Sequence, residues 1–223
     1  EDLRLWPLVR SRRSALALDG ETPLARAAFT ALLRRVVPGL CPRPWDAVPW
    51  PPHVHLGLFV HRVTDLSPGL YALARSAAGE GALREAMDPR FAWTRPAGCP
   101  ADLPLFLLRG GEFRDAATQV SCQQEIAGDG AFSLGMIAEF EPALRRHGAG
   151  FYKRLFWETG VIGQVLYLEA EAAGMRATGI GCFFDDPVHR LFGLAGRRFQ
   201  SLYHFTVGAP VEDPRLTTLP AYP

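Results

Sequence analysis

The longest helical pattern in the chain runs through residues 151–175, "FYKRLFWETGVIGQVLYLEAEAAGM". Apolar or small side chains recur at helical spacing at Leu155, Ile162, Leu166 and Ala170, which places them on one face of a helix. The remaining positions are also largely apolar, and a helix that is apolar nearly all round is buried. The pattern therefore predicts a long buried helix, inside the fold or in a subunit interface, with small residues that permit close approach of a second backbone.

Shorter patterns predict strands. The segment "HVHLGLFVHRV" alternates and is typical of a half-buried strand, with His53, His55 and His61 on its polar face. A turn at Pro68 and Gly69 followed by a second apolar run predicts a hairpin. Further strands are expected at residues 102–110, 131–141 and 200–211, with a helix as the alternative for the second of these.

Helices are expected between these runs. In "ETPLARAAFTALLRRVVPG", Thr22 is a suitable N-cap and Pro23 suits the first helical position. Because helices and strands do not alternate regularly and hairpins are present, the order favours an α+β fold over a doubly wound parallel sheet. We expect one domain over residues 1–223, or one half of a longer tandem protein. The remaining helices are expected at residues 81–87, 112–130 and 186–193.

Composition narrows the class of partners. Lysine and arginine number 24 against 23 acidic residues, which gives a net charge of +1. This balance predicts neither a nucleic-acid partner nor a charged membrane surface. No apolar run reaches the ~18 residues that a membrane span requires. A cytoplasmic protein is the simplest expectation.

The four cysteines are far apart and form no CxxC pair. A disulfide framework and a zinc ribbon are therefore not expected, and a reducing compartment fits. Cys122 is expected to be a buried helical thiol. His53 and His55 share one strand face, but a polar strand face is favoured over a metal site, so no metal is predicted.

Two segments have residues suited to a phosphorylated ligand. "RSRRS", from Arg10 to Ser14, combines guanidinium and hydroxyl donors, although a solvated basic segment is the alternative. "TGIGCFFDD" places Gly179 and Gly181 where backbone amides can approach a ligand, or where a helix simply caps and turns. Asp185 begins a pair of carboxylates that suit the cap of the next helix.

The order of these segments resembles a known family. A basic Arg-x-Ser segment opens the chain, and the late helix "GVIGQVLYLEAEAAGM" runs into "RATGIGCFFDD". "VHRLFGL", "QSLYHFTVG" and "PVEDPRL" follow. This order is similar to that of the nitroreductase-like FMN superfamily, and most similar to its SagB-type dehydrogenases and tandem nitroreductase-domain proteins.

The resemblance implies a mixed, mainly antiparallel sheet wrapped by helices, and a homodimer or pseudo-dimer with FMN in the interface. It implies that Arg12 and Ser14 hold the FMN phosphate and that Arg215 also reaches it. Many members carry a basic residue where this chain has Leu16, so Arg13 is expected to serve the flavin pyrimidine edge instead. The residues expected along the ring are Ile180, Gly181 and Cys182.

The resemblance implies an FMN-dependent oxidoreductase that moves hydride or electrons to or from a small organic substrate, with NAD(P)H as one electron donor. The alternative is a degenerate, non-catalytic module that serves dimerisation or completes a partner's flavin site. Leu16 and the proline-rich segment 42–55 favour this alternative. A third reading is a substrate-binding subunit of a peptide-modifying complex.

Overall fold

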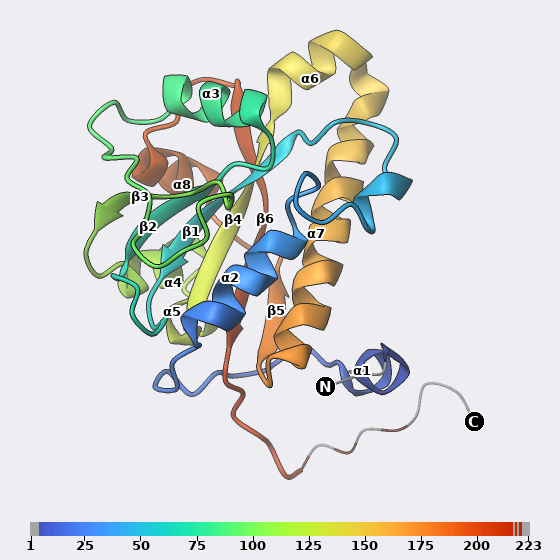
Figure 1. Ribbon diagram of the computed structural model, residues 1–223, viewed down its shortest axis with the longest axis vertical. Coiled ribbons are helices and arrows are strands. Elements are labelled where there is room, and N and C mark those ends of the chain that lie inside the picture. The colour runs from blue at the N-terminus through green and yellow to red at the C-terminus, as the bar shows by residue number, and fades with distance from the viewer. Residues whose placement is uncertain (1–4, 216, 218, 220–223) are drawn as a thin grey trace.

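A six-stranded antiparallel sheet forms the centre of the computed structural model (Figure 1), which describes residues 5–215, 217 and 219. Its strand order is β3-β2-β1-β4-β6-β5, and each of these neighbours pairs antiparallel. The strands are β1 (Val54–Val60), β2 (Gly69–Leu73), β3 (Leu105–Gly110), β4 (Phe132–Glu139), β5 (Arg176–Ile180) and β6 (Phe199–Gly208).

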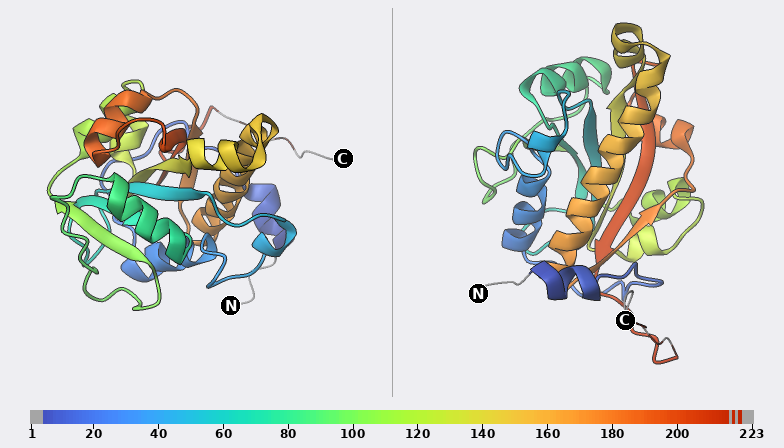
Figure 2. Two further views of the ribbon diagram at one scale, coloured as in Figure 1. Left: turned by 90° about the horizontal axis from the view of Figure 1, so that it is seen from above. Right: turned by 90° about the vertical axis from the view of Figure 1, so that its right-hand side faces the viewer.

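Helices cover both faces of this sheet, so the molecule has three layers (Figure 2). One hydrophobic cluster joins α2 and α7 to one face, and a second joins α3, α4 and α8 to the other. The expected α+β fold is confirmed. The helices are α1 (Leu5–Ser11), α2 (Arg26–Arg35), α3 (Ala77–Ala86), α4 (Arg114–Val120), α5 (Ile126–Asp129), α6 (Phe140–His147), α7 (Tyr152–Ala172) and α8 (Asp185–Phe192).

The long central helix is confirmed as α7, which crosses one face of the sheet (Figure 2). Leu155 and Ile162 lie on its fully buried side. Its opposite side is apolar as well, but within this chain it faces outward, and Trp157 and Tyr152 are 54% and 49% exposed. Within the single chain only one side of the helix is buried, because only that side has a sheet beneath it; burial of the other side in a subunit interface stays a prediction. Among the described residues, no helix combines the length and apolar character needed to cross a bilayer.

The half-buried strand expected over residues 53–63 is instead buried on both sides, because all of β1 is enclosed. The face that looked polar packs against α3 and α8. A side chain at Gly79 of α3 would lie 2.0 Å from the His55 ring, and one at Gly57 would lie 2.7 Å from Phe192 of α8. These two glycines make room for the large rings, which is why histidine can stand on a covered face.

Two helix boundaries also differ from the sequence prediction. The helix expected over residues 112–130 is divided into α4 and α5, because Cys122 and Gln123 take positive φ values of 55° and 60°. The helix expected to begin at Pro23 begins at Arg26. Leu24 instead pairs with Val63, since its amide N–H donates to the Arg62 carbonyl and its carbonyl accepts the amide N–H of Thr64, both at 2.9 Å, and the chain stays extended up to Ala25.

A buried ion pair fastens α7 to the sheet. Arg75, which directly follows the β2 hairpin strand, pairs with Glu158 of α7, and each residue is at most 2% exposed. The Glu158 carboxylate also accepts the amide N–H groups of His53 and Val54, at 3.2 Å. The Arg75 guanidinium donates to the Val54 carbonyl at 3.0 Å and lies 4.3 Å from the ring centre of Trp45. The pair is thus satisfied largely by main-chain groups, as a buried charge requires.

Candidate functional site

The N-terminal segment lies along the free edge of β5. The amide N–H of Ala15 donates to the Ala177 carbonyl at 3.1 Å, and the hydroxyl of Thr178 donates to the Ala15 carbonyl at 2.6 Å. Ser14 pairs in parallel with Ala177 at the same point. The "RSRRS" segment and the "TGIGC" segment, far apart in the sequence, are therefore neighbours.

Tyr167 of α7 joins the two segments. Its phenolic oxygen lies 2.9 Å from the Ser14 hydroxyl and accepts a hydrogen bond of 2.8 Å from the amide N–H of Gly179. The guanidinium of Arg12 lies 4.7 Å from the centre of its ring, a cation–π contact. The rings of Tyr167 and Phe205 meet edge to face, with their centres 4.8 Å apart. Sequence reasoning missed Tyr167, and the available signal was a phenolic hydroxyl within an apolar helical pattern.

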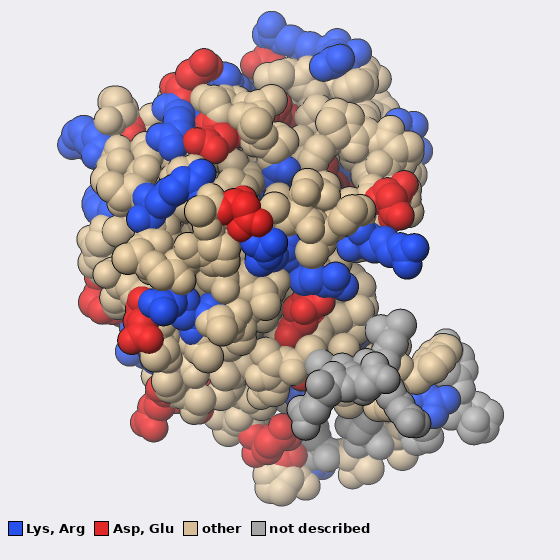
Figure 3. All heavy atoms as spheres, viewed as in Figure 1, with Lys and Arg blue, Asp and Glu red and all other residues tan. Residues whose placement is uncertain are grey.

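The cations of this region are only partly neutralised. Arg176 is paired with Glu171 at 3.0 Å and also donates to the Ser11 carbonyl. Arg13 donates to the carbonyls of Arg10 and Arg12, at 3.1 and 2.8 Å. Within the described ranges of the chain, no acidic side chain forms an ion pair with Arg12 or Arg13. Their charges are therefore available to an anion. On the face of the molecule seen in Figure 3, acidic and basic side chains are interspersed.

Next to Tyr167, the Tyr203 ring fills the side-chain space of Gly179. A Cβ atom on Gly179 would stand 2.5 Å from the phenolic oxygen of Tyr203 and 2.9 Å from its ring, so residue 179 has no room for a side chain. A Cβ on Gly181 would lie 3.8 Å from the same ring. Burial raises the pKa of Tyr203, with a smaller contribution from Tyr167, so this phenol keeps its proton at neutral pH.

The three residues predicted to lie along the flavin differ from one another in burial. Ile180 ends β5, and its side chain is buried in the cluster under α8. Gly181 and Cys182 follow it in an exposed loop. In the described part of the chain, the amide N–H groups of Cys182 and Phe183 donate to no other group. The Phe183 ring stacks on His204, with the ring centres 4.4 Å apart.

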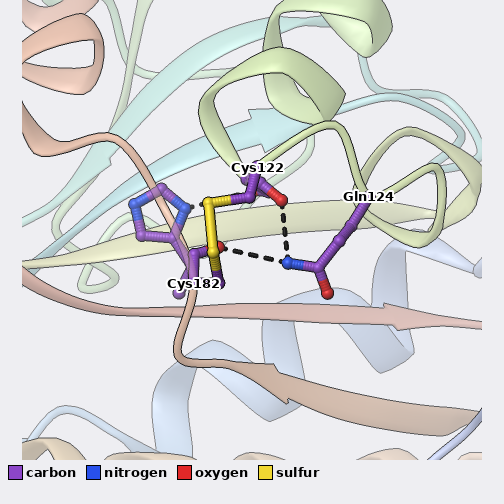
Figure 4. Close-up of a disulfide and its surroundings, with 5 residues drawn as sticks. Cys122, Gln124 and Cys182 are labelled. Atoms are coloured by element: carbon purple, nitrogen blue, oxygen red, sulfur yellow. Dashed lines mark hydrogen bonds between the residues drawn. A yellow bond between two sulfur atoms is a disulfide. The ribbon is translucent and has the colours of Figure 1, made fainter.

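Cys182 forms a disulfide with Cys122, across 60 residues of sequence (Figure 4). The expectation of unpaired cysteines is wrong for these two, because α4 and β5 converge through the fold and no local spacing signals it. The side-chain amide of Gln124 donates to the carbonyls of Ser121 and Cys182, at 2.8 and 3.1 Å. The turn between α4 and α5 is thereby tied to the loop after β5. Cys41 and Cys99 are free thiols.

No contact joins Arg215 to Arg12 in the part of the chain that the structure describes. It forms an ion pair of 2.7 Å with Asp213 and is well exposed. The chain leading to it, however, starts beside the N-terminal segment, since Val211 donates its amide N–H to the Ala17 carbonyl. A role for Arg215 at the phosphate stays a prediction.

Two buried histidines, His61 and His204, form hydrogen bonds inside the fold. His61 bonds the Ala127 carbonyl at 3.1 Å, and His204 lies between the hydroxyls of Ser121 and Ser201, at 3.3 and 3.2 Å. Over the described residues, no group of three or more histidine, cysteine or acidic side chains is arranged to hold a metal ion.

The sequence model of the nitroreductase family matches residues 70–209, which is more than half of the chain. The protein therefore belongs to the nitroreductase family. Among curated proteins, none matches its sequence.

Solved structures share this fold at low sequence identity. A structure from Anabaena variabilis assigned to the nitroreductases matches with a TM-score of 0.72 and 24% identity, covering 93% of this chain and 38% of that one. This chain thus spans well under half of that protein. A chain of the E. coli microcin synthetase McbBCD complex with truncated pro-MccB17 bound matches with a TM-score of 0.65 and 18% identity, covering 92% and 71%. The NADPH:FMN oxidoreductase of Vibrio harveyi complexed with NAD+ matches with a TM-score of 0.57 and 12% identity, covering 98% and 74%.

Proposed function

We propose that this protein is an FMN-dependent oxidoreductase that transfers hydride or electrons to or from a small organic substrate. One observation carries the proposal: Arg12, Ser14 and Gly179 converge on Tyr167, at the strand that leads into the exposed loop of Gly181 and Cys182. Membership of the nitroreductase family supports an oxidoreductase. The name of the Vibrio harveyi protein supports FMN as the cofactor and a reduced nicotinamide as an electron donor.

The phosphate of FMN would bind at the N-terminal segment. Arg12 offers a guanidinium without a carboxylate partner in the described structure, and Ser14 offers a hydroxyl within reach of the same side. This donor set is the one that phosphate prefers. Arg13 would face the electron-rich pyrimidine edge of the flavin, and Arg215 would add a second cation at the phosphate.

The ring would lie along the backbone of residues 179–182, closest to Gly181 and the loop that follows. Close approach of a flat ligand is easiest at backbone without Cβ atoms, which Gly181 offers in the exposed loop, whereas the Tyr203 ring fills the side-chain space of Gly179. The free amide N–H groups of Cys182 and Phe183 can donate to an electron-rich ring nitrogen. Ile180 would contribute its main chain, because its side chain is buried. When bound, the flavin supplies the two-electron chemistry, while these residues orient it.

A second subunit, or a second domain of the same kind, would cover the outer side of α7. That side forms a groove between α7 and the α2 region, lined by Phe156, Trp157, Gly160, Val161, Val165 and Leu168. Exposed apolar side chains gathered on one helix are typical of a protein interface. The 38% coverage of the Anabaena variabilis structure is compatible with a tandem pseudo-dimer as well as with a homodimer.

The second candidate function is a non-catalytic module that completes a partner's flavin site. Leu16 favours it, because this side chain is 73% exposed and supplies no cation where many family members have one. The E. coli complex, in which a chain of this fold occurs in a microcin synthetase, keeps open a role beside a peptide-modifying partner.

Titration of the purified protein with FMN, followed by quenching of flavin fluorescence, tests the main proposal. We expect saturable binding, weakened by about 1 to 3 kcal/mol, or roughly 5- to 150-fold in Kd, in Arg12→Ala and in Ser14→Ala. Arg109→Ala removes a cation from the opposite edge of the sheet and should leave Kd unchanged. Reduction of the bound flavin by NADPH would support the enzyme, whereas bound flavin that NADPH does not reduce would support the non-catalytic module. Absence of FMN binding to the protein, alone and mixed with its paired domain, rejects both.

A further inference from the structure

The disulfide between Cys122 and Cys182 lies at the surface. Cys182 is exposed in the loop after β5, and Cys122 is half-buried in the turn between α4 and α5. The exposed position of Cys182 is the kind of place where a thiol reagent attacks a disulfide without unfolding of the chain. Disulfides that only brace a core are shielded from such attack.

The two segments that carry these cysteines are also held together without the disulfide. The amide N–H of Phe184 donates to the Val120 carbonyl at 2.7 Å, and the Gln124 side chain reaches the Cys182 carbonyl at 3.1 Å. His204 contacts both sides, since it stacks on Phe183 and lies 3.3 Å from the Ser121 hydroxyl. Once the sulfur–sulfur bond is broken, these contacts keep the two thiols close enough to pair again.

The turn at Cys122 stores backbone strain. Cys122 and Gln123 both take left-handed φ angles, of 55° and 60°, which non-glycine residues seldom adopt and which two successive residues adopt more rarely. Such strain persists only where the surroundings impose it, and it occurs often in switch segments. Opening the disulfide removes one of the constraints on this turn.

We propose that Cys122 and Cys182 form a reversible dithiol/disulfide site that small dithiols reduce in the folded protein, and that its state sets the mobility of the loop at residues 181–184. The proposal stands apart from FMN binding, since it concerns the chain alone. Thiol redox conditions would then control the mobility of this loop, which is also the loop in which we place the flavin-facing amides.

The exchange begins with attack of a dithiol's thiolate on the sulfur of Cys182. A new sulfur–sulfur bond forms, the bond between the cysteines breaks, and Cys122 leaves as a thiolate that takes a proton from water. The second thiolate of the reagent then attacks its own sulfur in the mixed disulfide, and Cys182 leaves as a thiolate. The dithiol becomes a cyclic disulfide, and two electrons pass to the protein.

Counting of thiols in the native protein tests this exchange. The protein is incubated with graded dithiothreitol, quenched with acid, denatured, alkylated and weighed. We expect the number of alkylated cysteines to rise from two to four while near-ultraviolet circular dichroism remains native. Reoxidation should restore two, with Cys122 and Cys182 linked in the peptide map. The variant Cys41→Ser/Cys99→Ser isolates the pair and should change from zero to two.

Hydrogen exchange measures the consequence for the loop. Peptides covering residues 181–184 and 121–124 should exchange faster after reduction, and as fast in the variant Cys182→Ser, while peptides of α7 stay unchanged. The proposal is overturned if the disulfide resists dithiothreitol until the protein unfolds, if reoxidation pairs these cysteines with Cys41 or Cys99, or if loop exchange is the same in both states. These readouts need no flavin, so a failure of FMN binding leaves them intact.

Discussion

Gly179 and Tyr203 are in such close contact that the phenol occupies the volume a side chain on residue 179 would need. The distance from a built Cβ to the phenolic oxygen would be 2.5 Å. Gly179→Ala should therefore displace the ring and lower the free energy of unfolding by about 1 to 3 kcal/mol, measured by urea denaturation.

Two variants control this prediction. Gly81→Ala adds the same methyl group in α3, where nothing lies within 4 Å, and should stabilise the protein by about 0.5 to 1 kcal/mol. Gly179→Ala/Tyr203→Ala removes the clash, so it should be more stable than the sum of the two single changes predicts. Additive single changes would show that residue 179 does not press on the ring.

The Arg75–Glu158 pair should be essential for folding stability. Glu158→Gln keeps the size of the side chain but leaves the Arg75 charge buried without its counter-ion, which should cost about 3 to 5 kcal/mol. Thermal and urea unfolding measure the change. Glu141→Gln removes a solvent-exposed partner of Arg145 and should cost at most about 0.5 kcal/mol. Similar losses for both would contradict the assigned burial.

Stability should fall in mild acid because of two buried histidines. Burial lowers the pKa of His61 and of His204 from 6.5 to about 4. The unfolded chain binds these protons below pH 6.5 while the native chain does not, so stability is full above this pH and is lost as the pH falls toward 4. Each histidine should contribute a loss of about 2 kcal/mol between pH 7.5 and pH 5.

Urea unfolding at the two pH values measures this loss. His61→Gln should flatten the pH dependence by one histidine's share. An unaltered slope in His61→Gln would count against a neutral buried imidazole.

The apolar side of α7 should mediate self-association. Trp157→Asp places a charge in the groove beside Phe156 and should weaken a dimer by about 2 kcal/mol or more, roughly 30-fold in Kd. Sedimentation equilibrium measures this constant. Val211→Asp changes an equally exposed apolar residue outside the groove and should leave it unchanged. Association unaffected by Trp157→Asp would move the interface elsewhere.

Periodicity predicted the elements whose burial is one-sided or continuous. α7, the β1–β2 hairpin and the closing strand β6 follow from it, and so does the α+β class. Periodicity did not predict the burial of both faces of β1, because whether His55 faces water depends on Gly79 in α3. It failed at Cys122 because helical spacing continues through a turn whose φ angles depend on its tertiary surroundings.

The candidate site was predictable only in part. The Arg-x-Ser segment and the glycines indicated the two halves, and the fold brings Ser14 and Gly179 to the same tyrosine. Tyr167 and Tyr203 carried no motif, since a tyrosine in an apolar pattern is indistinguishable from a core residue. The disulfide required knowledge of how α4 and β5 converge, which no local spacing contains.

The pairing of residues 14–18 with residues 177–210 has a consequence for biosynthesis. Ser14 is positioned by Ala177, and Leu18 by Pro210. During translation, the arginine-rich segment at residues 10–14 emerges well before Ala177, so it has no partner until β5 has left the ribosome. Assembly of the candidate phosphate site at Arg12 and Ser14 consequently follows the synthesis of β5 and depends on contacts distant in sequence, which are slow to form. A chain truncated before β5 would lack this site however well its earlier hairpin folded.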